Sequence, residues 1–138
     1  MVKPEIIDTR IYKLQEYLEK LNKLKNIGKD EFFSDFRNSS SAKYLLQVII
    51  ECCLDIATHI IASEKFRRPD DYADSFRVLN ENKIVPDSLI NNLVDMAKFR
   101  NRIVHIYWEI DEQFVYDILQ NYLGDFERYI ESISKNIS

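Results

Sequence analysis

Three side chains that can act on a phosphate group lie close together in the segment FRNRIVHIYWEID, at Arg100, His105 and Tyr107. Arginine binds phosphate through a planar set of donors, and histidine accepts and donates protons near neutral pH. A tyrosine ring stacks on a nucleobase, or its hydroxyl forms a hydrogen bond. These residue types favour proton transfer at a bound phosphate ester as the chemistry of this segment.

With RNA as the substrate, the chemistry would be a metal-independent transesterification, in which a ribose 2′-oxygen loses its proton and attacks the neighbouring phosphorus. His105 is the candidate for acid–base catalysis, and Arg100 is the candidate for stabilising charge on the phosphate oxygens. Further candidates for substrate binding or support are Lys98, Asn101 and Arg102. This hypothesis requires neither a metal ion nor a cofactor.

The spacing of these residues also fits a purely structural interpretation. Arg100 could form an ion pair with Asp95 or Asp111, and His105 could be a hydrogen-bonded histidine in the interior. A short motif is a hypothesis until its structural setting is known. From the spacing alone, the structural interpretation is the more common one.

A second polar set, Glu51, Asp55 and His59, repeats every four residues and therefore lies along one side of a helix. The set could be a metal site or a polar seam at an interface or beside the motif. A metal site on a helix normally needs further ligands of fixed geometry, and the sequence offers no second set at matching spacing. We therefore favour the seam, and we hypothesise that Glu51 or Asp55 orients Arg100.

Four aromatic residues, Tyr44, Tyr72, Tyr116 and Trp108, could line a nucleotide cleft. Large aromatic side chains more often anchor cores and interfaces, so we favour a packing role for them.

The chain has 138 residues, of which only 2 are Gly and 3 are Pro. This length fits one domain, spanning 1–138, and so few breakers imply long elements between turns. The net charge of -4 argues against a protein that nucleic acid attracts by its total charge. A local basic cleft is still allowed, and it would need Lys98, Arg100 and Arg102, counted twice in a dimer.

The N-terminal segment lacks the apolar region of a secretory signal, and polar residues interrupt the most apolar stretch. The adjacent cysteines, Cys52 and Cys53, are poorly placed for a mutual disulfide and fit a reducing compartment. We expect a cytoplasmic protein that does not enter a membrane.

Apolar residues recur every three or four positions through most of the chain, which predicts amphipathic helices. The predicted long helices cover residues 5–26, 42–66, 86–99 and 111–132, with short helices at 31–36 and 70–79. The serine-rich segment 38–41 is expected to cap the central helix. In this prediction Arg100 lies at a helix C-terminal turn, His105 and Tyr107 follow either in an irregular stretch or at the start of a turn, and Tyr72 and Tyr122 face inward. The fold class is all-α, an antiparallel four-helix bundle with short accessory helices.

The segment from Arg100 to Tyr107 resembles the R-x4-H-x-Y signature of HEPN domains of the HepT type, and Asn101 matches the residue common after the arginine. The resemblance extends over residues 42–119, through LQVIIECCLDIATHIIA to LVDMAKFRNRIVHIYWEID.

This resemblance implies an HEPN-like homodimer in which two R-x4-H motifs meet in a cleft at the interface. It implies the toxin of a type VII toxin–antitoxin system, an endoribonuclease whose antitoxin is a minimal nucleotidyltransferase of the MntA type. It also implies that the antitoxin transfers AMP to Tyr107 and so silences the toxin. The alternative is a non-catalytic dimeric helical module that binds a nucleotidyltransferase or a nucleotide.

Overall fold

The computed structural model describes residues 2–137. Within these residues the chain forms seven α-helices and one short 3₁₀ helix, and no strand. This confirms the predicted all-α fold class. The helices, in chain order, are α1 (Pro4–Lys25), α2 (Lys29–Ser34), α3 (Phe36–Glu64), α4 (Tyr72–Glu81), α5 (Asp87–Ile106), the 3₁₀ helix η1 (Tyr107–Glu109), α6 (Glu112–Asn121) and α7 (Gly124–Asn136).

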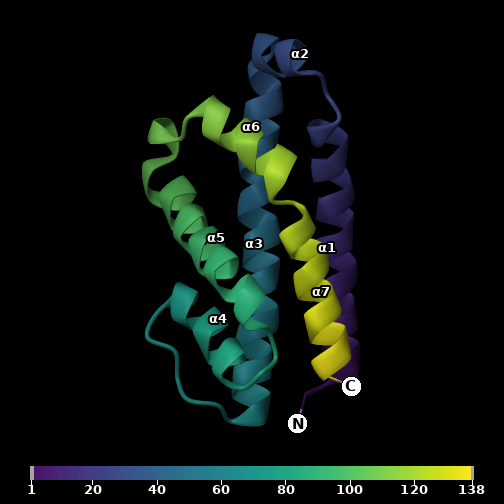
Figure 1. Cartoon of the computed structure of the whole chain (residues 1–138), viewed down its shortest axis with the longest axis vertical. Helices are drawn as coiled ribbons and strands as arrows, with labels where there is room; N and C mark the ends of the chain where they lie inside the picture. Colours follow the sequence, from purple (N-terminus) through teal and green to yellow (C-terminus); the bar gives the residue numbers. More distant parts are fainter. Residues whose placement is uncertain (1, 138) are drawn as a thin grey trace.

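The long helix α3 is the centre of the bundle, and α1, α4, α5 and α6 all pack against it (Figure 1). Its buried side chains recur at helical spacing, as Leu46, Ile49, Ile56 and Ile60 show. By length and composition alone, α3 could cross a membrane, although half of that window is buried inside the bundle. A helix that packs against several neighbouring helices needs an apolar composition similar to that of a membrane-spanning helix.

The prediction that residues 38–41 cap the central helix is wrong. The helix begins earlier, at Phe36, because the Asp35 carboxylate accepts a hydrogen bond from the Arg37 amide at 2.9 Å. The serines therefore lie inside the first turns of α3, and the Ser39 hydroxyl reaches Glu112 at 3.2 Å. The other end comes at Lys65, whose φ of 57° places it in the left-handed region.

The predicted last helix, 111–132, is two helices in the structure. The break lies at Tyr122, which is 46% exposed, and at Leu123, whose backbone remains in the helical region. A local break of this kind barely disturbs the apolar spacing, so periodicity runs straight through it. The break lets α6 cross the upper end of the bundle while α7 turns down to pack against α5 (Figure 1).

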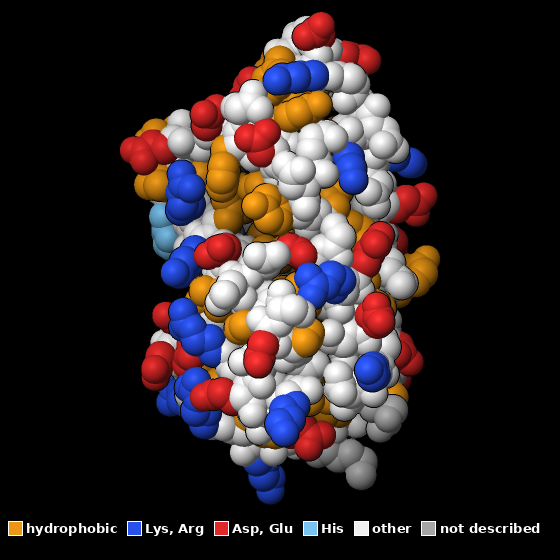
Figure 2. Space-filling model, viewed as in Figure 1, with side chains coloured by type: hydrophobic (Ala, Val, Ile, Leu, Met, Phe, Trp, Pro, Cys, Tyr) orange, Lys and Arg blue, Asp and Glu red, His pale blue; other side chains and the backbone are white. Residues whose placement is uncertain are grey.

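The surface mixes acidic and basic side chains over most of the visible face, and hydrophobic side chains gather between α5 and α6 (Figure 2). Phe114 on α6 and Tyr122 at its end are 42% and 46% exposed, and both line one hollow with α5. No uniform basic surface covers this face, which agrees with the net charge of -4.

Candidate functional site

Arg100 is held in place by contacts from three directions. Its Nε and Nη2 atoms both donate to Glu51 Oε2, at 3.1 and 2.7 Å, and Nη1 donates to the side-chain oxygen of Asn101 at 3.2 Å. The guanidinium carbon lies 5.1 Å from the centre of the Tyr72 ring. With only 16% of its side chain exposed, Arg100 has little freedom left before any substrate arrives.

The structure thus brings one of the two seam carboxylates to the motif. Glu51 pairs with Arg100 across the contact between α3 and α5, and its own side chain is 35% exposed. Asp55, one turn further along α3, is exposed. Within residues 2–137, the ion pair of Arg100 is with Glu51 rather than with Asp95 or Asp111.

The predicted end of the helix at Arg100 is wrong, because α5 continues to Ile106. No breaker interrupts this segment, and Phe99 and Ile103 bury one helical face as they pass the core. His105 therefore lies in the last helical turn and is exposed. It is not the interior histidine of the structural interpretation.

Arg100 and His105 do not point the same way. They are five positions apart on one helix, which separates their directions by about 140° around the axis, since each residue advances by about 100°. Arg100 faces α3 and α4 through Glu51 and Tyr72, whereas His105 faces solvent. A single chain therefore leaves the two candidate catalytic groups apart.

Tyr107 follows in η1 and is 41% exposed. The Nζ atom of Lys43 lies 4.8 Å from the centre of its ring, and Lys43 itself is only 9% exposed. Sequence reasoning missed Lys43. The available signal was its position on α3, since Lys43 extends the four-residue spacing of Glu51 and Asp55 by two steps toward the N-terminus.

The remaining support candidates lie on the outer face of α5. Lys98 and Arg102 are both exposed, and Lys98 lies beside α4 residues such as Arg77 and Glu81. The Arg102 guanidinium lies 5.7 Å from the centre of the Phe114 ring. Asn101 is half-buried, and its contact with Arg100 gives it a part in holding the motif.

The aromatic residues divide into two groups. Tyr116 packs against Phe32 and Phe33 at ring-centre distances of 5.3 and 5.4 Å, as a core anchor does. The prediction that Tyr72 faces inward is wrong, because it is 49% exposed and stacks on Arg100. Trp108, at 77% exposed, belongs to the same exposed group.

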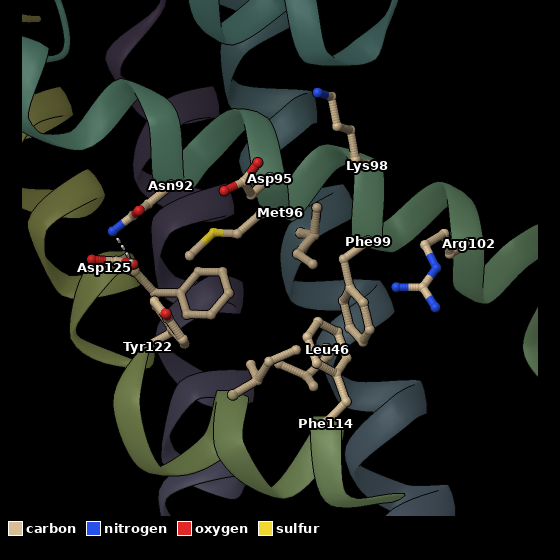
Figure 3. Close-up of a pocket in the computed structure, with 13 residues that line it drawn as sticks. Leu46, Asn92, Asp95, Met96, Lys98, Phe99, Arg102, Phe114, Tyr122 and Asp125 are labelled. Carbon is tan, nitrogen blue, oxygen red and sulfur yellow. Dashed lines mark hydrogen bonds between the residues drawn. The ribbon is translucent and has the colours of Figure 1, made fainter. Parts of the chain in front are cut away.

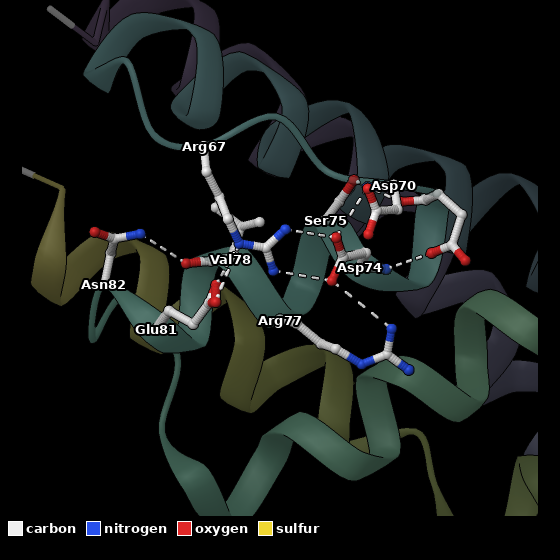
Figure 4. Close-up of polar contacts among 9 residues, drawn as sticks. Arg67, Asp70, Asp74, Ser75, Arg77, Val78, Glu81 and Asn82 are labelled. Atoms are coloured by element: carbon white, nitrogen blue, oxygen red, sulfur yellow. Dashed lines mark hydrogen bonds and ion pairs between the residues drawn. The ribbon is translucent and has the colours of Figure 1, made fainter.

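The helix that carries Tyr72 is anchored by a polar network (Figure 4). Arg67 donates to Asp74 at 2.7 and 3.0 Å and to Glu81 at 2.9 Å. Asp71 caps α4 by accepting from the Asp74 amide at 2.7 Å. The Arg67 guanidinium lowers the pKa of Asp74 to about 2. The network fixes α4, and with it the ring that covers Arg100.

The third member of the seam, His59, is half-buried, and its Nε2 atom is buried without a hydrogen-bond partner. No group of three or more His, Cys, Asp or Glu side chains within residues 2–137 is arranged to hold a metal ion. The spacing of Glu51, Asp55 and His59 therefore does not become a ligand cluster in three dimensions.

Comparison with known proteins assigns the family. The family described as Ribonuclease HepT-like matches residues 14–133. The mRNA nuclease HepT of Shewanella oneidensis is 32% identical over 129 residues, covering 94% of this chain and 96% of that protein. The tRNA nuclease HepT of Aphanizomenon flos-aquae is 29% identical over 133 residues, covering 96% of this chain and 90% of that protein.

Solved structures agree with this assignment. A tri-AMPylated Shewanella oneidensis HEPN toxin in complex with its MNT antitoxin matches with a TM-score of 0.89 and 30% identity, covering 97% of this chain and 100% of that one. A toxin–antitoxin complex with AMP-PNP matches with a TM-score of 0.88 and 30% identity, covering 96% and 99%. These findings confirm the resemblance seen in the R-x4-H-x-Y segment, and the chain belongs to the HepT-like ribonuclease family.

Proposed function

We propose that the chain is the toxin of a type VII toxin–antitoxin pair, a homodimeric endoribonuclease that cleaves RNA without a metal ion. The observation that carries the proposal is the contrast between the surroundings of the Arg100 and His105 side chains. Arg100 is fixed by Glu51 and ready to hold a phosphate, and His105 is exposed and available for proton transfer. Two relatives over nearly the whole chain are an mRNA nuclease and a tRNA nuclease.

The proposed reaction breaks one phosphodiester bond. A His105 imidazole takes the proton of the ribose 2′-hydroxyl, and the freed oxygen attacks the neighbouring phosphorus. Arg100 holds the charge that develops on the phosphate oxygens. The bond from phosphorus to the 5′-oxygen breaks, and that oxygen receives a proton from a second imidazole. The products are a 2′,3′-cyclic phosphate and a 5′-hydroxyl.

A second copy of the chain supplies what one copy lacks. Because Arg100 and His105 diverge on α5, a pair of chains whose motifs face each other brings each arginine toward the other chain's histidine. Trp108, next to Tyr107 in the sequence, and Tyr44, next to Lys43 on α3, are 77% and 59% exposed, and such an interface would bury aromatic side chains of this kind. Two copies of Lys98, Arg100 and Arg102 would also give the cleft its positive charge.

Silencing acts on Tyr107. We propose that a nucleotidyltransferase antitoxin of the MntA type transfers AMP from ATP to the Tyr107 hydroxyl and releases pyrophosphate. The ring is 41% exposed, and the Lys43 ammonium lies 4.8 Å from its centre, where it favours the added phosphates. A solved relative is a tri-AMPylated toxin bound to its MNT antitoxin.

The deciding experiment is an RNA cleavage assay on the purified chain, without divalent metal, beside the His105→Ala variant. We expect cleavage by the unmodified chain and a loss of about 10²-fold or more in the variant. Glu109→Gln, an exposed change nearby, is the matched control and should cleave normally. Equal cleavage by all three proteins would leave the non-catalytic binding module as the function.

The silencing step has its own measurement, the intact mass of the chain after incubation with ATP and its nucleotidyltransferase. We expect a gain of whole AMP units that map to Tyr107, together with loss of RNA cleavage. Tyr107→Phe should show no gain and should stay active in the presence of the antitoxin. A Tyr107→Phe chain that still gains AMP would place the modification elsewhere.

A further inference from the structure

A cavity of about 330 Å³ opens between α5, α6, α7 and α3, and its lining includes Arg102 but not Arg100, His105 or Tyr107. This volume is at the lower end of the range for small-ligand sites, and it suits a group about as large as one nucleotide. The residues that matter for its chemistry are Asn92, Phe99, Arg102, Phe114, Tyr122 and Asp125.

Aromatic rings form much of the wall of the cavity. Figure 3 shows Phe99 and Phe114 on one side and Tyr122 toward the other. Phe99 and Phe114 meet edge to face at 5.5 Å, while Phe114 and Tyr122 remain 42% and 46% exposed. Exposed rings around an apolar hollow are the surface on which an unstacked nucleobase packs.

One end of the cavity carries a buried carboxylate with acceptor capacity to spare. The Asp125 side chain is only 10% exposed. It accepts one hydrogen bond, from Asn92 Nδ2 at 3.0 Å, and its contact with Arg128 is longer, at 3.7 Å. Burial raises the pKa of Asp125. A carboxylate has about four acceptor sites, so this one would favour a ligand that brings N–H donors.

The other end of the cavity carries a cation that lies on the same stripe of α5 as His105. Arg102 stands on the side opposite Asp125 (Figure 3). Residues 98, 102 and 105 are spaced by four and three positions, so they share one helical face. The axial rise from Arg102 to His105 is about 4.5 Å. A phosphate bound at Arg102 would therefore lie next to the imidazole.

We propose that the cavity binds an unstacked guanine nucleotide of the RNA strand that is being cleaved. The base packs between Phe114 and Tyr122 and donates its N1–H and its amino group to Asp125. Its phosphate lies at Arg102, and the bond to be broken is then the neighbouring phosphodiester at His105. This inference rests on the proposed ribonuclease function and adds to it a base preference beside the cleavage point.

The test begins with binding, which does not depend on catalysis. Titration calorimetry of the full chain compares 5′-GMP with 5′-UMP, which offers one N–H donor on its base edge. We expect GMP to bind more tightly, and Asp125→Asn to weaken GMP about tenfold or more while leaving UMP nearly unchanged. Phe114→Ala should weaken both nucleotides. Asp8→Asn, an exposed carboxylate on α1, is the matched control.

Two results in this arm would overturn the inference. One is failure of the unmodified chain to bind either nucleotide, and the other is equal binding of GMP and UMP. Thermal unfolding of each variant shows whether it is folded. If Asp125→Asn does not fold, Phe114→Ala carries the test, because an exposed ring can be removed with little effect on the core.

The second arm uses short RNA substrates that contain either one guanosine or none. We expect cleavage next to the guanosine, and Asp125→Asn should abolish that preference without abolishing cleavage. Cleavage with no base preference overturns the inference and leaves the proposed function standing. GMP binding without any cleavage overturns the proposed function and assigns the cavity to a free nucleotide instead of the RNA strand.

Discussion

The two candidate catalytic residues occupy the same helix under opposite conditions. Arg100 has a carboxylate, an amide and an aromatic ring from its own chain around it, and only 16% of its side chain is exposed. His105, five residues later, is exposed in the last turn of α5. The contrast teaches that one chain holds the Arg100 side chain in place by its own contacts and leaves the His105 side chain without such a restraint, which is why the proposed mechanism completes the proton-transfer half of the site by assembly.

Substitutions at the two residues should separate their roles. Arg100→Ala and His105→Ala should each lower RNA cleavage by about 10²-fold or more, since each removes a group that acts in the transition state. Arg100→Ala should also lower the free energy of unfolding by about 1–3 kcal/mol, because Glu51 loses its partner. His105→Ala should leave it unchanged. Urea unfolding of both variants checks the difference, and equal destabilisation would contradict the contrast.

Mixing the two inactive variants tests whether assembly completes the site. In a mixed dimer, the intact arginine of one chain faces the intact histidine of the other, so a measurable fraction of the cleavage should return. The measurement is the cleavage rate after Arg100→Ala and His105→Ala chains are unfolded and refolded together. Separately refolded chains, assayed before exchange, are the control. No return of activity would mean that each chain carries its own complete site.

A smaller effect is expected when the partner of Arg100 is changed. Glu51→Gln keeps the shape but removes the charge that holds the guanidinium, so kcat should fall about tenfold while KM changes little. Asp55→Asn, one turn along α3 and exposed, is the matched control and should cleave normally. Steady-state kinetics on a short RNA gives both constants. Unchanged kinetics in Glu51→Gln would remove the positioning role.

The smallest expected effect is on stability, and it concerns α4, the helix that carries Tyr72. The pKa of Asp74 is about 2 when folded, against an ordinary value of 3.8. Its ion pair with Arg67 therefore adds stability that is fully present above about pH 4 and is lost as the pH falls toward 2. Circular dichroism should show that the stability of the Asp74→Asn variant depends less on pH, between about pH 4 and 2, than the stability of the unmodified chain does. At neutral pH, Asp74→Asn should lower the stability only slightly, because the Arg67 side chain is 45% exposed and solvent screens its ion pair.

Much of the candidate site could be predicted because it depends on local chemistry. The residue types from Arg100 to Tyr107 allowed phosphate chemistry as a hypothesis, and the resemblance of the surrounding segment made it the favoured one. The four-residue spacing of Glu51 and Asp55 places a carboxylate on the helix face that reaches Arg100. The choice between these two carboxylates depends on how α3 and α5 cross, which spacing within one helix does not specify.

Other features were missed because their signals are long-range or weak, and the helical spacing that places Lys43 on the same side of α3 as Glu51 does not say which residue it meets. Lys43 lies 64 positions before Tyr107 in the sequence, and only the packing of α3 beside η1 brings its ammonium to that ring. The break between α6 and α7 leaves the apolar spacing intact. The cap at Asp35 competes with the equally suitable serines that follow it, and the backbone geometry selects the aspartate.

Composition and periodicity alone established a helical bundle, since 2 Gly and 3 Pro leave few places for a turn. The motif, together with the resemblance over residues 42–119, indicated the family and its chemistry. The direction in which each side chain points was decided by packing, because helix rotation depends on which apolar face the neighbouring helices bury. That rotation turns Arg100 inward to Glu51, leaves His105 in solvent, and puts Arg102 in the wall of the cavity.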